Sequence, residues 1–277
     1  MANIKIRNQD EMDVYNREFW NELCGTPLAQ ELGVKDSTKK SLKKYDEGYF
    51  DFYPYLKGYF PISEMRGRQV LDVGLGYGTL AQWLAENGVI YTGMDIARGP
   101  VEMVNRRIAQ NELEGHAIQG SVLRCPFPDE SFDYFVSIGC LHATGNFEAA
   151  LNEAYRVLRP GGKLIFMVYY AYSYRRLRFH AFDTFRYWLW DRFKLPLSTS
   201  MKFLPSDRDF HLDGTAALGT EYLSERDIRR LAVNFSSIDT KLENFWPEGR
   251  YRNQSREKLL GEVSKKWGMD IYVTAVK

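Results

Sequence analysis

The sequence predicts an α/β fold with a doubly wound, mostly parallel β-sheet, and three observations lead to this prediction. First, an apolar run over residues 70–73 includes an acid and is followed by alternating glycines and a helical pattern from Leu80. Second, another apolar run over residues 89–95 ends in an acid. Third, strand-like and helix-like patterns alternate as far as residue 169. Such alternation is typical of strand–helix–strand units in a parallel sheet.

Residues 1–65 precede the first strand and are predicted to form a helical cap. Ser37 and Thr38 have the short polar side chains that favour the N-cap of a helix. The region is rich in aromatic residues, which either pack on the domain or shape the mouth of a substrate site. Tyr15 and Trp20 are the candidates for contact with a substrate.

Residues 66–277 form the second predicted unit, which contains the sheet. The turn Arg159-Pro160-Gly161-Gly162 separates a helix from a strand, because proline ends the helix and glycine permits the chain to reverse. Apolar spacing predicts helices at 101–110 and 147–158 and further strands at 117–120, 134–138, 164–169, 236–246 and 269–276.

The segment from residue 171 to about 222 is an insertion in which aromatic residues and arginines are interleaved. Three interpretations remain open. It is a lid helix with solvated arginines, a lid whose arginines match an anionic group of the substrate, or a basic amphipathic helix that lies on a membrane or holds a partner. Tyr170 and Arg175 are the candidates for substrate contact in this part of the chain.

The composition is that of an ordinary globular protein. The 277 residues carry a formal net charge of +1, which gives no reason to expect nucleic acid as a partner. The three cysteines are scattered without metal-ligand spacing, so we expect reduced thiols, no metal site and a cytoplasmic protein. No apolar run approaches the ~18 residues of a membrane span, and no signal peptide is expected.

The glycine-rich turn after the first strand predicts a nucleoside-containing cofactor. Its glycines leave no Cβ between the backbone and a ligand, and the following helix offers unpaired N–H groups. Residues 76–81 formally fit the dinucleotide pattern G-x-G-x-x-A, with Asp95 at about the required spacing of ~20 residues. However, Asp72 directly before the turn favours a cofactor with an ammonium group over one with a pyrophosphate.

The stretch Asp72-Val73-Gly74-Leu75-Gly76-Tyr77-Gly78 resembles motif I of the class I S-adenosylmethionine-dependent methyltransferases. Residues 121–133 are similar to the "GD…LPFPD.SFD" segment of that family, and residues 158–164 to its "LRPGG.L" turn. The resemblance is closest to type 11 enzymes and ubiquinone/menaquinone C-methyltransferases. It implies a Rossmann-like sheet of seven strands, the last antiparallel, and S-adenosyl-L-methionine as the cofactor.

The resemblance also assigns roles to residues of the cofactor site. The glycines would lie under the methionine part, Asp72 would take its amino group and Asp95 would accept from the ribose hydroxyls. Ser121 stands where the family usually has an aspartate for the adenine amino group, and a hydroxyl is a weaker acceptor than a carboxylate. The predicted cofactor residues are Asp72, Gly74, Gly76, Gly78, Asp95, Ile96, Ser121, Val122 and Gly139.

Methyl transfer from a sulfonium is an in-line displacement that mainly requires alignment and exclusion of water. A general base is needed only where the nucleophile carries a proton, and His142 at the end of a strand is the candidate. We therefore predict a methyltransferase for a small or amphiphilic substrate, and leave open an anionic one and peripheral membrane contact. The alternatives are a nicotinamide-dependent oxidoreductase and a non-catalytic cofactor-binding or membrane-associated protein.

Overall fold

The computed structural model describes residues 6, 8–23, 25–193, 209, 215 and 217–277. They contain a single seven-stranded sheet in the order β3-β2-β1-β4-β5-β7-β6. Neighbouring strands are parallel except β7, which is antiparallel to both β5 and β6. The strands are β1 (Gln69–Val73), β2 (Ile90–Asp95), β3 (His116–Gln119), β4 (Phe132–Ile138), β5 (Leu158–Tyr169), β6 (Ser237–Glu243) and β7 (Asp270–Val276).

This topology confirms the predicted Rossmann-like fold, including the single antiparallel strand at the end of the chain. The strand order reverses between β1 and β4, so the carboxyl ends of these strands flank the crevice in which doubly wound sheets bind ligands. One boundary differs from the prediction. β5 begins at Leu158, because this residue already pairs with Phe132 before the left-handed turn at Gly161.

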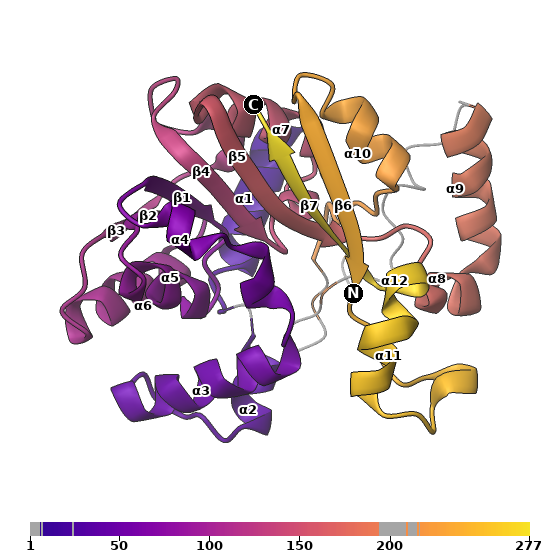
Figure 1. Ribbon diagram of the computed structural model, residues 1–277, viewed down its shortest axis with the longest axis horizontal. Coiled ribbons are helices and arrows are strands. Elements are labelled where there is room, and N and C mark those ends of the chain that lie inside the picture. The colour runs from indigo at the N-terminus through magenta and orange to yellow at the C-terminus, as the bar shows by residue number, and fades with distance from the viewer. Residues whose placement is uncertain (1–5, 7, 24, 194–208, 210–214, 216) are drawn as a thin grey trace.

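Helices cover both faces of the sheet (Figure 1). The domain helices are α5 (Thr79–Glu86), α6 (Arg98–Gln110), α7 (Phe147–Val157) and α10 (Glu225–Leu231). Alternate strand residues point into two cores. Val70 and Tyr91 pack under α5 and α6, whereas Leu71 and Phe135 pack under α7 and α10. The sheet is thus buried on both faces, and its carboxyl edge is the part available to a ligand.

The N-terminal region, predicted to be a cap, contains four helices that precede β1. Its helices are α1 (Gln9–Phe19), α2 (Thr26–Glu31), α3 (Lys39–Phe52) and α4 (Ile62–Met65), with a 3₁₀ turn η1 (Leu56–Tyr59). Thr38 is the N-cap of α3, as its sequence position predicted, and its side chain accepts from Ser41 N. The amide of Asn16 in α1 donates to Ala143 O beyond β4 at 3.1 Å. The cap therefore contacts the carboxyl edge of the sheet.

A buried ion pair holds α3 to the domain. Arg107 in α6 donates through Nη1 and Nη2 to the two carboxylate oxygens of Asp46, at 2.9 and 3.0 Å. Gln82 and Thr79 from α5 complete the cluster, at 2.8 Å from Arg107 and 2.6 Å from Asp46 respectively. The Arg107 side chain is 0% exposed. Because a bidentate pair excluded from water fixes both partners, it sets the position of α3 against the glycine-rich turn.

The insertion begins with two helices, α8 (Tyr174–Phe179) and α9 (Ala181–Phe193). In Figure 1, α9 stands at the outer edge of the molecule beyond α10. Residues 194–208, 210–214 and 216 of the predicted lid lie outside the described residues. The C-terminal part adds η6 (Gly249–Tyr251), α11 (Arg256–Glu262) and α12 (Ser264–Trp267) before β7. None of the described helices combines the length and the apolar character that crossing a membrane requires.

The cluster around Arg107 generates a prediction about stability. Asp46→Ala should lower the free energy of unfolding by about 3–5 kcal/mol, because it leaves a buried guanidinium without its anion. Urea denaturation of both proteins measures the difference. The control is Asp129→Ala. The Asp129 side chain is 74% exposed and pairs with Arg156, so its loss should lower the free energy of unfolding by less than about 1 kcal/mol. Equal losses in the two variants would contradict the prediction.

Candidate active site

A cavity of about 470 Å³ opens at the carboxyl ends of β1, β2 and β4. This volume is in the range of small-molecule sites, roughly 300–1,000 Å³. The glycine-rich turn, the residues after β2 and the cap helices α1 and α3 contribute to its wall. Every residue predicted to bind the cofactor lies in this wall. The predicted substrate residue Trp20 does so as well, whereas Tyr15, Tyr170, Arg175 and His142 are not among the lining residues.

The glycine-rich turn forms the floor of the cavity. Gly74 has φ +85°, and a Cβ built on it would lie 2.3 Å from Cβ of Cys140. Gly78, with φ +74°, is the left-handed N-cap residue of α5, and a Cβ there would lie 2.9 Å from Val104. Only glycine fits both positions without displacing neighbours. The two glycines therefore allow the turn to pack closely against Cys140 and Val104.

Asp95 lies at the end of β2, at the edge of the cavity. Its Oδ2 accepts from Leu75 N at 2.8 Å and its Oδ1 from Ala97 N at 2.9 Å. Burial raises the pKa of Asp95 to about 6, and the backbone donors oppose that increase. Each carboxylate oxygen has a second lone pair for another donor. The carboxylate is thus held in one orientation and retains capacity for two further hydroxyl groups.

Asp72 lies one strand away, at the end of β1. Its Oδ2 accepts from the Tyr91 hydroxyl at 3.0 Å. Burial raises the pKa of Asp72 to about 7, and the nearby charge of Asp95 adds to the increase. A cationic group in the cavity would offset this cost of burial. Two carboxylates side by side fit a ligand that carries an ammonium and a ribose, and would repel a pyrophosphate.

The far end of the cavity contains a feature that sequence reasoning missed. The Ser121 hydroxyl donates to Oδ2 of Asp13 at 3.1 Å, and Asp13 comes from α1 of the cap. Both residues line the cavity together with Ile96 and Val122. A carboxylate thus lies beside position 121, where the family usually has an aspartate, although it comes from another part of the chain. No local sequence signal marks Asp13, which is 108 residues away.

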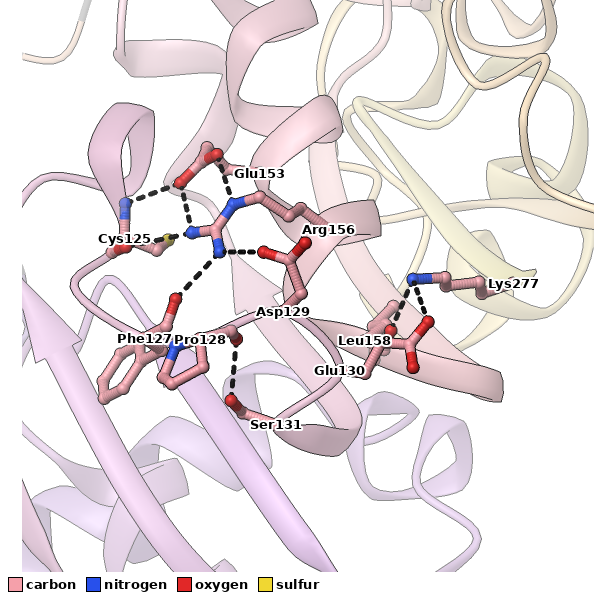
Figure 2. Close-up of polar contacts among 10 residues, drawn as sticks. All are labelled: Cys125, Phe127, Pro128, Asp129, Glu130, Ser131, Glu153, Arg156, Leu158 and Lys277. Atoms are coloured by element: carbon pink, nitrogen blue, oxygen red, sulfur yellow. Dashed lines mark hydrogen bonds and ion pairs between the residues drawn. The ribbon is translucent and has the colours of Figure 1, made fainter.

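Two side chains of α7, Glu153 and Arg156, form hydrogen bonds with the backbone of the segment after Val122 (Figure 2). Arg156 donates to the carbonyl oxygens of Phe127 at 2.8 Å and of Cys125 at 3.0 Å, and Glu153 accepts from Cys125 N at 2.7 Å. These contacts satisfy backbone groups of a loop that has no strand partner. Arg156 and Glu153 therefore hold in place the loop that resembles "LPFPD.SFD".

The remaining wall is aromatic and acidic. The Tyr169 hydroxyl, at the end of β5, donates to Oδ1 of Asp209 at 2.9 Å, and both residues line the cavity. Burial raises the pKa of Asp209 above its ordinary value. Asn16 Oδ1 and the Tyr272 hydroxyl are buried lining groups that have no hydrogen-bond partner among the described residues. They are polar atoms that a ligand in the cavity could satisfy.

His142 is fully buried and its ring packs against Tyr169, with the ring centroids 4.2 Å apart. Burial lowers the pKa of His142 to about 3, so its imidazole is neutral at physiological pH. Neither ring nitrogen has a hydrogen-bond partner among the described residues. The structure does not bring this predicted base to the cavity wall. No metal-binding cluster of His, Cys, Asp or Glu occurs within the part of the chain that the structure describes.

This sheet order is that of the class I S-adenosylmethionine-dependent methyltransferases, and the similarity to that family implies S-adenosylmethionine as the cofactor. Residues 71–166, from β1 to β5, match the family described as a methyltransferase domain. The predicted resemblance is confirmed for this part of the chain.

Curated relatives share this domain. The chain is 34% identical over 119 residues to a fatty-acid O-methyltransferase of Mycolicibacterium smegmatis, covering 42% of this chain and 40% of the relative. It is 35% identical over 100 residues to a demethylmenaquinone methyltransferase of Tropheryma whipplei, covering 36% and 41%. A malonyl-[acyl-carrier protein] O-methyltransferase of Serratia marcescens is 33% identical over 115 residues, covering 42% and 44%. The chain thus spans about two fifths of the length of these relatives.

Solved structures extend the likeness of the fold beyond this domain. An S-adenosylmethionine-dependent methyltransferase from Mesorhizobium loti has a TM-score of 0.53 at 16% identity, covering 81% of this chain and 97% of that chain. One from Methanosarcina mazei has a TM-score of 0.54 at 18% identity, with the same coverage. At these identities the likeness concerns the fold.

The raised pKa of Asp72 predicts how cofactor binding depends on pH. An ammonium binds the ionised carboxylate, so binding lowers the pKa of Asp72 and releases a proton below pH about 7. Affinity for S-adenosylhomocysteine should therefore rise with pH up to about 7, by up to about tenfold per unit, and then level off. Calorimetry from pH 5.5 to 8 measures this, with Asp72→Asn as the variant that removes the dependence. A flat profile in the unmodified protein would contradict the assignment.

The contact between Asp13 and Ser121 predicts that a carboxylate introduced at position 121 can replace that of Asp13. Asp13→Ala should weaken S-adenosylhomocysteine binding by roughly ten- to a hundredfold, the effect of losing a hydrogen bond to a charged group. Adding Ser121→Asp to that variant should restore most of the affinity. Asp10→Ala is the matched control, since Asp10 is an exposed carboxylate on the same helix. If the double variant binds no better than Asp13→Ala, the adenine end lies elsewhere.

Proposed function

We propose that the protein transfers the methyl group of S-adenosylmethionine to a small or amphiphilic metabolite. The observation that carries this proposal is the cavity, whose wall combines two buried carboxylates, the glycine-rich turn and several aromatic side chains. The aromatic side chains include Tyr49, Phe52 and Tyr272. Such a wall suits a ring or an acyl chain, because burial of apolar area is its main source of affinity.

The names of the relatives support an amphiphilic acceptor. They describe enzymes for a fatty acid, a demethylmenaquinone and a malonyl group on acyl-carrier protein. The described lining residues contain Asp13, Glu31, Asp72, Asp95 and Asp209 but no lysine or arginine. The sequence analysis left open an anionic substrate. The described part of the wall contains no cationic side chain that could pair with such a substrate.

When bound, the cofactor would supply an activated methyl group on its sulfonium. The residues of this chain would hold that group in line with the acceptor and exclude water. Where the acceptor atom carries a proton, we assign its removal to Asp209, in place of the predicted His142. Asp209 lines the cavity and accepts from Tyr169, and its raised pKa makes it a stronger base than an ordinary carboxylate.

The two alternatives from the sequence are less well supported. A nicotinamide dinucleotide would place its pyrophosphate on the glycine-rich turn beside Asp72, which would repel it, whereas Asp95 would suit the ribose of either cofactor. A non-catalytic protein would need the cofactor site but not the aromatic part of the wall.

Radiolabelled methyl transfer tests the proposed function. The full chain is incubated with S-adenosyl-[methyl-³H]methionine and pools of fatty acids, hydroxylated quinones and acyl thioesters, and labelled products are extracted. We expect transfer to at least one amphiphilic pool, abolished by Asp95→Ala through loss of cofactor binding. Asp209→Asn should retain S-adenosylhomocysteine affinity within about twofold and slow transfer to a protonated acceptor by about 10²–10⁴-fold. Cofactor binding without transfer to any pool would contradict the proposal.

A further inference from the structure

Helix α9 has its polar and apolar sides reversed relative to a surface helix of a soluble protein. Its buried side carries Thr184, Tyr187 and Asp191, and the Tyr187 hydroxyl donates to the buried Asp227 of α10. Its outer side carries aromatic rings, and Phe182 is 71% exposed. A helix normally turns its apolar stripe to the core. The reversal indicates that the outer side has a function of its own.

The exposed rings are concentrated on this surface. Of the eleven exposed large hydrophobic residues among the described part of the chain, six lie between Leu177 and Phe193. We call the outer surface of α8 and α9 the aromatic–basic face, and define it by Arg178, Phe179, Phe182, Phe185, Trp188, Arg192 and Phe193, all of which are exposed. Scattered exposed apolar residues are normal, but a contiguous group marks an interaction surface.

Arginines are mixed with these rings. The guanidinium of Arg178 lies 5.1 Å from the centroid of the Phe179 ring, and that of Arg192 lies 5.8 Å from the centroid of Phe193. Neither arginine has an ion-pair partner among the described residues, whereas Arg186 pairs with Asp183 at 3.9 Å. Rings that enter a bilayer surface and arginines that pair with anionic headgroups are the two elements of an interfacial helix.

The face is also close to the cavity along the chain. Tyr169 lines the cavity at the end of β5, and α8 begins at Tyr174. Figure 1 shows α9 at the outer edge of the molecule, and the rings on its outer side are exposed among the described residues. A flat partner could therefore approach α8 and α9 without meeting the rest of the fold.

We propose that the aromatic–basic face docks the protein on a lipid bilayer that contains anionic headgroups. The rings bury their apolar area at the boundary between headgroups and acyl chains, and the arginines pair with the phosphates. This surface does not depend on the proposed methyl transfer, since it needs no cofactor. The bilayer is favoured over a second copy of the chain because the arginines need anions, and the face itself presents more guanidinium groups than exposed carboxylates.

Vesicle sedimentation of the full chain tests the proposal. One set of vesicles contains phosphatidylcholine alone and the other contains phosphatidylcholine with 30% phosphatidylglycerol. We expect binding to the anionic vesicles, weakened by 0.5 M salt, and little binding to the neutral ones. Each arginine near an anionic surface should contribute about fivefold in affinity, so Arg178→Glu with Arg192→Glu should lower it by at least twentyfivefold. Phe182→Ser with Phe185→Ser should also abolish binding.

Matched controls lie elsewhere on the surface. Val233→Ser removes an apolar residue that is 75% exposed outside the face, and Lys40→Glu reverses an exposed charge on α3. Both should bind like the unmodified protein, and circular dichroism confirms folding of every variant. Equal binding to both kinds of vesicle, or none to either, overturns the proposal. So does a dimer in sedimentation velocity that Phe182→Ser with Phe185→Ser dissociates, since the face would then be covered by a second copy. These outcomes leave the cofactor and transfer experiments unaffected.

Discussion

The structure depends on two carboxylates that the fold buries at adjacent strand ends. Asp72 and Asp95 lie 3% and 7% exposed, and burial raises the pKa of each. Such an arrangement is unfavourable unless a ligand supplies positive charge or hydroxyl donors. The parallel sheet forces the two acids together, because β1 and β2 end at the same edge. The pairing of these two carboxylates therefore follows from topology as much as from side-chain chemistry.

The N-terminal helices line the cavity together with the strand ends. The buried pair of Arg107 with Asp46 fixes α3, and the Tyr45 ring then stacks on Tyr77 of the glycine-rich turn with centroids 4.3 Å apart. The helix α1 also brings Asp13 to the cavity wall, beside Ser121. The N-terminal region thus contributes to the wall of the cavity, although the family match begins only at residue 71.

The sequence predicted those cavity residues whose position is determined by the strand or turn that contains them. Glycine spacing and the acid at a strand end placed Asp72, Gly74 and Asp95 at the cavity, because each follows directly from the strand that carries it. Asp13 and Asp209 were not predicted, since each reaches the cavity through a contact between distant segments. His142 follows a strand as predicted, but its ring turns into the core against Tyr169, and a backbone position does not determine that orientation.

The central claim is that this cavity receives S-adenosylmethionine through Asp72 and Asp95. A crystal structure of the protein exposed to equal concentrations of S-adenosylhomocysteine and NADH tests it most directly. The account predicts S-adenosylhomocysteine above the glycine-rich turn, with its amino group at Asp72 and its ribose hydroxyls on the Asp95 carboxylate. A dinucleotide in that place, with the pyrophosphate over the glycines, would contradict it.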